Sequence, residues 1–276
     1  MQTTGSPAVL TVLGSGTLLP DAARCSAAFH LEVQGRGILL DCGTGTLHGL
    51  ARWGVAWRDI DLVAISHYHT DHVGDLAALL AALKFSGRAR PLTLIGPLGF
   101  RDFLGRLAAA FGAYILDPGF DVRVVELSES DHWNGDWIGT SVRCCPTPHT
   151  EESVAFRLVG TWGSLGYTGD TGPSTDVADF LAGCVVIVAE CALGDPPDLG
   201  THLSPRTVAS LAQRAVPKLL VLSHVYPPQT PDDALARVKE SYEGEAVVAR
   251  DGLRMSLASG DVVLESGTGR TRRTRR

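Results

Sequence analysis

A dense group of metal-capable side chains between positions 66 and 72 constrains this sequence more than any other feature. The stretch reads Ser-His-Tyr-His-Thr-Asp-His, so three imidazoles and one carboxylate fall within six residues. It follows an apolar run at 62–66 that predicts a buried strand, and it precedes a segment at 73–84 whose apolar residues repeat every three or four positions, as in a helix packed on a sheet. Because α/β proteins place functional sites in such loops, the sequence predicts an α/β fold with a metal site here.

The spacing within this stretch indicates more than one ion. His67 and His69 alternate as residues on one side of an extended segment do, whereas Asp71 and His72 are turned elsewhere as the chain enters the helix. Imidazole and carboxylate groups suit Zn²⁺, and two ions about 3.5–4 Å apart can hold a bridging hydroxide. The alternative is a surface histidine run. The position of the stretch, between a buried strand and an amphipathic helix, argues against it.

The rest of the chain reads as two α/β halves that share one core. Ser204 and Thr230 each precede a proline, the pattern of an N-cap residue followed by proline at the first helical position. A strand is predicted at 218–223, between the two helices that these signals open. Further strands are predicted at 8–13, 28–33, 38–41, 92–95, 121–127, 137–144, 153–159, 164–168 and 185–189.

Length and composition fit an ordinary folded protein. The 276 residues are 45% hydrophobic and 20% charged, which excludes disorder, collagen and coiled coil. No linker divides the chain, so we expect one domain over 1–267 and a disordered arginine-rich tail over 268–276. The apolar runs fall far short of the roughly 18 residues of a membrane span, and no secretory signal is visible. The six cysteines form no CxxC pattern, so we expect reduced thiols and a cytoplasmic protein.

The distribution of charge argues against a nucleic-acid partner. The formal net charge is −6 although five of the last seven residues are arginines, so the rest of the chain carries −11. Phosphate contacts dominate nucleic-acid affinity, and nucleic-acid binders carry a basic footprint. An acidic body therefore favours a small-molecule substrate.

The stretch at 66–72 resembles the HxHxDH signature of the metallo-β-lactamase superfamily, whose fold is a four-layered αββα sandwich. The other parts of that family's pattern follow in order as an early aspartate at Asp41, a third histidine at His149, an aspartate at Asp170 and a last histidine at His224. The resemblance implies one ion held by His67, His69 and His149, a second held by Asp71, His72 and His224, and Asp170 as a bridge between them.

The resemblance also implies the metal and the general chemistry. Zinc is the expected metal, and manganese and iron are the alternatives. Asp41 matches an aspartate that orients the histidine loop without binding an ion. His69 stands where the redox-active di-iron branch has glutamate, so hydrolysis is favoured over redox chemistry. Homodimers are common among relatives, although the sequence itself carries no signal for oligomeric state.

Flanking residues resemble the ribonuclease Z-like phosphodiesterase branch of the superfamily. The glycine-containing segments at 13–17, 40–46 and 167–171 look like that branch, and Pro148 stands where the glyoxalase and lactamase branches tend to have glycine. Glu190 and His202 resemble a paired Glu and His that such enzymes place beside the metals. A histidine held by a carboxylate can stay protonated and donate a proton to a leaving alkoxide.

Two departures argue against tRNA maturation. His202 is followed by Leu-Ser-Pro rather than the Ser-Thr of tRNA-processing members. The long basic, glycine-rich arm that clamps tRNA in those nucleases is missing, because residues 102–145 form a short segment that is acidic in places. Both departures favour a small phosphodiester substrate.

We therefore expect a dinuclear metal-dependent hydrolase, a phosphodiesterase acting on a small phosphodiester or cyclic nucleotide through a metal-bridging hydroxide. Asp71 or Asp170 would orient the hydroxide, and His202, supported by Glu190, would protonate the leaving oxygen. The alternatives are a carboxyl-ester, lactone or thioester hydrolase on the same metals, a tRNA 3′-end endonuclease, and a binding protein with a vestigial site. All seven expected ligands are present, which argues against the last of these.

Overall fold

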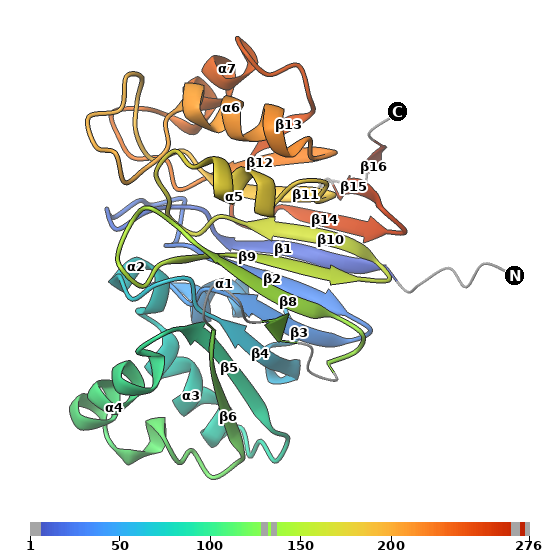
Figure 1. Ribbon diagram of the computed structural model, residues 1–276. Helices are drawn as coiled ribbons and strands as arrows, with labels where there is room; N and C mark the ends of the chain where they lie inside the picture. Colours follow the sequence, from blue (N-terminus) through green and yellow to red (C-terminus); the bar gives the residue numbers. More distant parts are fainter. Residues whose placement is uncertain (1–6, 128–131, 134–136, 266–270, 274–276) are drawn as a thin grey trace, which may run out of the picture.

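The computed structural model describes residues 7–127, 132–133, 137–265 and 271–273, which fold into two packed β-sheets with helices on the outer faces (Figure 1). The first sheet is antiparallel in one half and parallel in the other. In spatial order its described strands are β16 (Thr271–Arg273), β15 (Asp261–Glu265), β14 (Arg254–Ala258), β1 (Ala8–Gly14), β2 (Ala28–Val33), β3 (Arg36–Leu40), β4 (Ile60–Ala64), β5 (Leu92–Pro97) and β6 (Val122–Leu127).

The second sheet is built in the same mixed way. Its strands pair in parallel at one end and antiparallel at the other. In spatial order the strands that the structure describes are β13 (Ala246–Val248), β12 (Leu219–Ser223), β11 (Val186–Glu190), β10 (Gly163–Tyr167), β9 (Val154–Gly160), β8 (Ser141–Pro146) and β7 (His132–Trp133).

Amphipathic helices cover both sheets. In α6 the buried residues Val208, Leu211, Ala212 and Ala215 follow the three- and four-residue spacing of one helix face. The start signals also form as predicted, since Ser204 and Thr207 make a capping box at α6 and Thr230 caps α7. The helices are α1 (Thr46–Arg52), η1 (Trp57–Asp59), α2 (Thr70–Val73), α3 (Leu76–Phe85), α4 (Phe100–Phe111) and η2 (Ala113–Ile115) in the first half, and α5 (Thr175–Phe180), α6 (Pro205–Ala215) and α7 (Pro231–Lys239) in the second.

The core is divided into layers by the alternation of side chains along each strand. In β2, Phe29, Leu31 and Val33 point into the core between the sheets, whereas Ala28 joins the apolar cluster under α1, α3 and α4. A separate cluster lies under α5, α6 and α7. The Phe29 ring contacts Tyr167 of the opposite sheet, with centroids 5.3 Å apart. This arrangement confirms the four-layered αββα sandwich.

The helix predicted over 73–84 is interrupted, and this is a correction. The chain makes the short helix α2, pauses at Gly74 and Asp75, and resumes as α3. A side chain at position 74 would meet Thr44 Oγ1 at 2.4 Å, so the two loops are in contact there. The Asp75 carboxylate accepts hydrogen bonds from the backbone N–H groups of Gly45 and Leu47. The break therefore joins the histidine loop to the loop after β3.

Two further expectations concern where a strand begins and whether the C-terminal tail is ordered. The strand predicted at 137–144 begins only at Ser141, because Thr140 N–H closes a turn onto the carbonyl of Trp137. In the tail expected to be disordered, 271–273 instead pair with β15 as β16, and the rest of 268–276 lies outside the described residues. The domain boundary at 267 stays a prediction. None of the described helices combines the length and apolarity needed to cross a membrane.

Buried His30 makes the stability of the fold sensitive to acid. Its side chain is 3% exposed, and its Nε2 atom has no hydrogen-bond partner. Burial, with Arg254 nearby, lowers the pKa of His30 to about 4. Because the unfolded chain binds a proton at this residue below about pH 6.5 and the folded chain does not, stability is lost as the pH falls from 6.5 towards 4.

We expect the wild-type protein to lose about 2 kcal/mol more unfolding free energy than His30→Gln between pH 7 and pH 5. The glutamine fills a similar volume without titrating, so every other titrating group is matched in the two proteins. Urea unfolding at the two pH values measures the difference. Parallel pH profiles for the two proteins would contradict the assignment of acid sensitivity to His30.

Candidate metal centre

The predicted site residues meet where the parallel strands end. Asp41 follows β3 and the histidine stretch at 66–72 follows β4, whereas in the second sheet Asp170 follows β10, Glu190 ends β11 and His224 follows β12. Carboxyl ends of parallel strands lie at one edge of a sheet, and the two sheets face each other, so both sets of residues converge. In Figure 1 helix α2, which carries two of the predicted ligands, lies at the left edge of the molecule.

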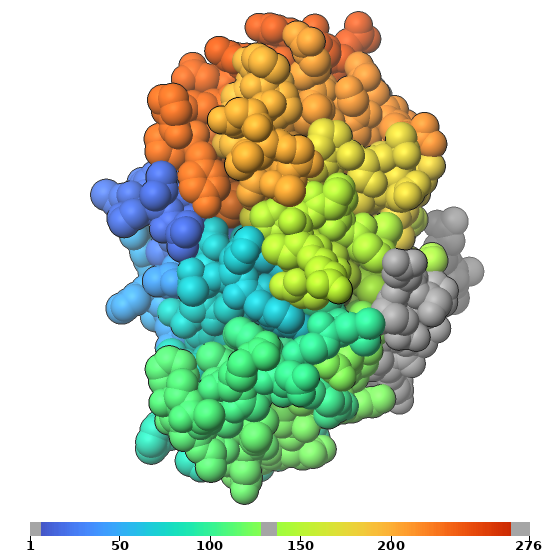
Figure 2. Space-filling model, turned by 60° about the vertical axis from the view of Figure 1, so that its left-hand side comes forward, coloured from blue at the N-terminus to red at the C-terminus, as the bar shows by residue number. Residues whose placement is uncertain are grey.

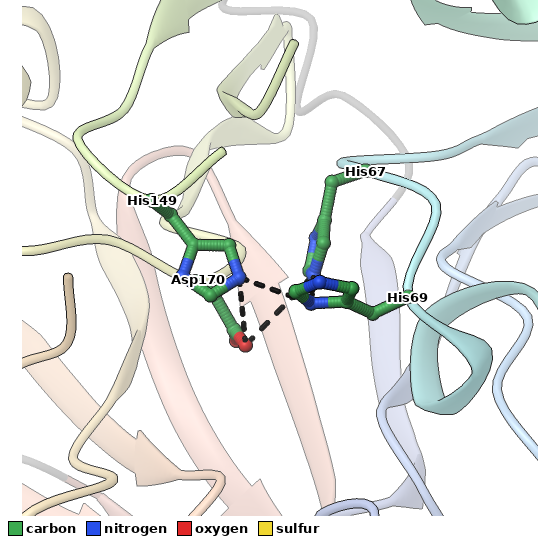
Figure 3. Close-up of side chains that lie close together, drawn as sticks. All are labelled: His67, His69, His149 and Asp170. Atoms are coloured by element: carbon green, nitrogen blue, oxygen red, sulfur yellow. Dashed lines mark hydrogen bonds and ion pairs between the residues drawn. The ribbon is translucent and has the colours of Figure 1, made fainter. Parts of the chain in front are cut away.

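A first ligand group is formed by His67, His69, His149 and Asp170, whose donor atoms lie within 4.8 Å of one another. His67 and His69 approach from one side, and His149 and Asp170 from the other (Figure 3). His69 Nδ1 is 3.1 Å from both His67 Nε2 and His149 Nε2. Asp170 Oδ2 is 3.9 Å from His67 Nε2 and 3.8 Å from His149 Nε2.

A second ligand group is formed by Asp71, His72 and His224, again within 4.8 Å. Asp71 Oδ2 is 3.1 Å from His224 Nε2 and 3.9 Å from His72 Nε2. The other oxygen of Asp170, Oδ1, faces this group at 3.4 Å from His72 Nε2 and 3.7 Å from His224 Nδ1. Asp170 thus presents one oxygen to each group.

Outer partners orient the rings so that their lone pairs point inward. His67 Nδ1 lies 3.0 Å from Ser66 Oγ, and His149 Nδ1 lies 3.1 Å from the Thr201 carbonyl. When these Nδ1 atoms carry the proton, each Nε2 atom is left as an acceptor that faces the first ligand group. Burial lowers the pKa of both histidines, well below the ordinary value for His67, so the rings are neutral as metal ligands must be.

The donor set fits divalent cations. His72 Nε2, Asp170 Oδ1 and His224 Nδ1 are buried and have no hydrogen-bond partner, although buried polar atoms are normally paired. Burial opposes charge on Asp170, but His224 and His72 lower its pKa well below the ordinary value, so the carboxylate is ionised. Burial likewise opposes charge on His72, but Asp170 and Asp41 raise its pKa well above the ordinary value. The same negative field favours a bound cation.

Asp41 lies behind the second ligand group and accepts hydrogen bonds from three residues. Its Oδ2 atom accepts hydrogen bonds from His72 Nδ1–H at 2.7 Å, Ser66 Oγ–H at 2.8 Å and Tyr167 O–H at 2.5 Å. Its Oδ1 atom accepts the backbone N–H of Ser66 at 2.7 Å. The contact with His72 leaves the Nε2 atom of that ring facing Asp71 and Asp170.

Glu190 and His202 lie together beside the first ligand group. Glu190 Oε1 accepts hydrogen bonds from His202 Nδ1–H at 2.9 Å and Thr171 N–H at 2.7 Å, and Oε2 accepts the backbone N–H groups of Ala192 and Leu203. Burial raises the pKa of Glu190. Burial opposes charge on His202, but the bond to Glu190 outweighs it and raises the pKa of the histidine. His202 Nδ1 is 4.0 Å from Asp170 Oδ2.

Every predicted site residue therefore lies at the centre, and the structure adds partners that were not predicted. Tyr167 and Ser66 donate to Asp41, and the Tyr226 ring makes a T-shaped contact with His224, with centroids 5.4 Å apart. Tyr167 and Ser66 belong to the motif strings that carried the resemblance, so the local sequence marked the segments. Their partner could be found only from the fold, because Tyr167 and Asp41 come from opposite sheets.

Comparison with known proteins places the chain in a family. The profile of the Anti-Pycsar protein Apyc1 family matches residues 8–241. The chain belongs to the Apyc1 family. The match spans the two ligand groups, Asp41, and the Glu190–His202 pair.

Relatives of this Apyc1 family member include ribonuclease Z proteins. The ribonuclease Z of Mycobacterium sp. (strain KMS) is 29% identical over 285 aligned positions, which cover 94% of this chain and 99% of the relative. The ribonuclease Z of Mycolicibacterium gilvum (strain PYR-GCK) is 27% identical, covering 91% and 96%.

Solved structures share the fold of this Apyc1 family member. The metallo-β-lactamase fold protein YhfI from Bacillus subtilis superposes with a TM-score of 0.78 at 20% identity, covering 91% of this chain and 99% of the other. The short form of human tRNase Z (ELAC1) gives 0.74 at 23% identity, covering 90% and 99%. A diphosphatase from the PhnP family gives 0.72 at 20% identity, covering 92% and 98%. The chain thus has the metallo-β-lactamase fold, and its sequence is similar to ribonuclease Z proteins along nearly its whole length.

Asp41→Asn should weaken metal binding by this Apyc1 family member more than Tyr167→Phe does. The asparagine amide sets an N–H group against donors from Ser66 and His72, whereas the phenylalanine removes one donor and leaves the carboxylate in place. For Asp41→Asn we expect roughly 10- to 100-fold weaker zinc affinity, the usual loss for a partner behind a metal ligand. Zinc titrations of the metal-free proteins measure the affinity of both variants. An unchanged affinity in Asp41→Asn would show that Asp41 does not position His72.

Proposed function

We propose that this chain is a dinuclear metal-dependent phosphodiesterase that hydrolyses small phosphodiesters, cyclic nucleotides among them. The observation that carries the proposal is the Glu190–His202 pair beside the two ligand groups. An alkoxide leaving group requires a proton donor, and a histidine whose pKa is raised by a buried carboxylate supplies one near neutral pH. The proposal rests on this pairing of an acid with a metal centre.

His67, His69 and His149 would hold one ion, and Asp71, His72 and His224 would hold a second. Asp170, which presents one oxygen to each ligand group, would contribute to both. Zinc is the metal that this set of imidazole and carboxylate donors favours, and manganese and iron are the alternatives. When bound, two such ions supply Lewis acidity that lowers the pKa of water and neutralises charge on phosphoryl oxygens.

The remaining chemistry belongs to the chain's own side chains. Asp71 or Asp170 accepts a hydrogen bond from the attacking water and orients it. The contact to Glu190 uses His202 Nδ1, so Nε2 is the ring atom that faces the leaving oxygen and gives it a proton. Because Glu190 also accepts hydrogen bonds from three backbone N–H groups, its carboxylate is fixed and holds the ring in one orientation.

The size and charge of the chain support a small substrate. The described part of the segment at 102–145 holds most of α4, then η2, β6, β7 and most of β8, with 128–131 and 134–136 outside the described residues, so these elements of the fold account for most of it. Residues 1–269 carry a formal charge of −11, which weakens contacts to a polyanion.

A tRNA 3′-end endonuclease is the second candidate, and one observation favours it. The alignment with the mycobacterial ribonuclease Z extends over 99% of that relative. The two candidates share the same metal centre and the same acid, so they differ in substrate affinity and not in the chemical step.

Turnover of bis(p-nitrophenyl) phosphate by protein reconstituted separately with zinc and manganese tests the proposal. We expect turnover with at least one metal, and faster cleavage of cyclic nucleotides than of precursor tRNA at matched concentration. Preference for precursor tRNA would establish the second candidate. With two ions demonstrably bound, absence of phosphodiester turnover would contradict both candidates and favour a carboxyl-ester, lactone or thioester hydrolase.

His67→Ala should abolish turnover and lower the metal content. The residue is fully buried and its Nε2 atom faces the other donors of the first ligand group, so alanine removes a ligand and leaves a cavity. His48→Ala, at an exposed position on α1, is the matched control and should keep both properties. Metal analysis after gel filtration and turnover are measured on the same samples. A His67→Ala protein that retains full metal and full rate would remove His67 from the centre.

His202→Ala should keep the metal and lose rate in a way that depends on the leaving group. For cyclic nucleotides, which leave as an alkoxide, we expect a loss of roughly 10²–10⁴-fold, the usual contribution of a general acid. For bis(p-nitrophenyl) phosphate the loss should be much smaller, because p-nitrophenolate leaves without protonation. In the wild type the rate should fall as the pH rises through the pKa of His202, which lies above its ordinary value.

Glu190→Gln tests the same pair by changing the carboxylate and leaving His202 in place. The variant removes the charge that raises the pKa of His202, so the alkaline fall in rate should move to lower pH. Equal losses for the two leaving groups in His202→Ala, or an unmoved pH limb in Glu190→Gln, would remove the pair from the mechanism.

A further inference from the structure

We infer that Asp251 is a positioning residue for the metal ligand His224 and acts through the backbone of Ser15. The inference rests on the two-ion centre proposed above and adds a residue that no motif in the sequence marks. Asp251 lies in the turn between β13 and β14, and it is separated from Ser15 by 236 positions in the chain. Neither Asp251 nor Ser15 belongs to a ligand group.

His224 needs an external restraint because its backbone is in an uncommon conformation. It follows the last residue of β12 and has a φ of 56°, in the left-handed region that residues with a Cβ rarely adopt. Such a conformation persists where surrounding contacts determine it. The N–H of His224 donates to the carbonyl of Ser15 at 3.1 Å, and Ser223 Oγ–H donates to the same carbonyl at 3.4 Å. The Ser15 carbonyl therefore sets where the ligand's backbone turns.

Asp251 in turn determines where that carbonyl lies. Its Oδ1 atom accepts both the backbone N–H and the hydroxyl of Ser15, each at 2.8 Å, and its Oδ2 atom accepts the backbone N–H of Cys25 at 2.8 Å. Gly16 N–H closes the loop onto the Cys25 carbonyl at 2.7 Å. A carboxylate that accepts three hydrogen bonds from both ends of one loop leaves Ser15 little freedom to move.

The hydrogen bond from His224 N–H to the Ser15 carbonyl connects the two sheets. β1, which leads to Ser15, belongs to the first sheet, and β12, which leads to His224, belongs to the second. Asp251 lies in the turn that joins β13 of the second sheet to β14 of the first. A neighbouring bond runs the same way, since Arg24 donates to the carbonyl of Val225 at 3.2 Å. On the face in Figure 2 the blue N-terminal segment lies against an orange segment from the other half of the chain.

The effect is confined to the second ligand group. Among the residues that the structure describes, the hydrogen bonds of His67, His69 and His149 involve neither Ser15 nor Asp251. Loss of Asp251 should therefore weaken the ion held by the second ligand group and spare the other.

Zinc titration of the metal-free protein, by calorimetry and by metal analysis at limiting free zinc, tests the inference without using substrate. For Asp251→Asn we expect the Kd of the second ion to rise about 10-fold or more, as for other lost partners behind a metal ligand. The Kd of the first ion should stay as in the wild type. Ser15→Ala removes only the hydroxyl donor and should show the same selectivity with a smaller change, so the test stands if Asp251→Asn folds poorly.

Asp61→Asn is the matched control. Asp61 is also a buried carboxylate of the first sheet, but it pairs with Arg36 and Arg88 near the start of β4, away from the centre. It should lower the unfolding temperature without selective loss of one ion. If the Asp251 and Ser15 variants bind both ions as the wild type does, or lose both equally, the inference is overturned. A wild-type protein that binds a single ion would overturn the two-ion centre and the inference together.

Discussion

A buried set of carboxylates and imidazoles that needs cations is the constraint on which the rest of this structure depends. Asp170 is buried and ionised, with one oxygen toward each ligand group, and several polar atoms around it have no partner in the protein. Burial of such charge is costly unless opposite charge accompanies it. The strands, the short loops that follow them and the break after α2 all serve to bring these donors to one point.

Two of the rings that face the centre, those of His72 and His224, are supported by carboxylates outside the ligand groups, and in different ways. Asp41 reaches His72 directly and also binds Tyr167 of the opposite sheet, so a single buried carboxylate joins the layers. The inferred support for His224 is indirect and passes through a backbone carbonyl. In both cases long-range hydrogen bonds restrict the orientation of a candidate ligand, which a strand end alone leaves open.

The Glu190–His202 pair gives this centre a candidate proton donor in addition to its candidate metal ligands. The fold alone is shared by enzymes with different substrates, so the functional argument has to come from the site. A buried carboxylate with four donors can orient a histidine, raise its pKa and keep it beside the metal ligands. That arrangement suits a leaving group that must be protonated, which is why we favour phosphodiesters over activated esters.

The sequence by itself determined the ligand types, their order along the chain and the strands that precede them. Those features are local: an apolar run next to turn-forming glycines marks β2, a three- and four-residue repeat marks α6, and the stretch at 66–72 carries four metal-capable side chains within six residues. Only the tertiary structure decided which oxygen of Asp170 faces which group, that the helix breaks at Gly74, and that Asp41 meets Tyr167. These depend on contacts between residues up to 126 positions apart, and periodicity in a chain has no information about such pairs.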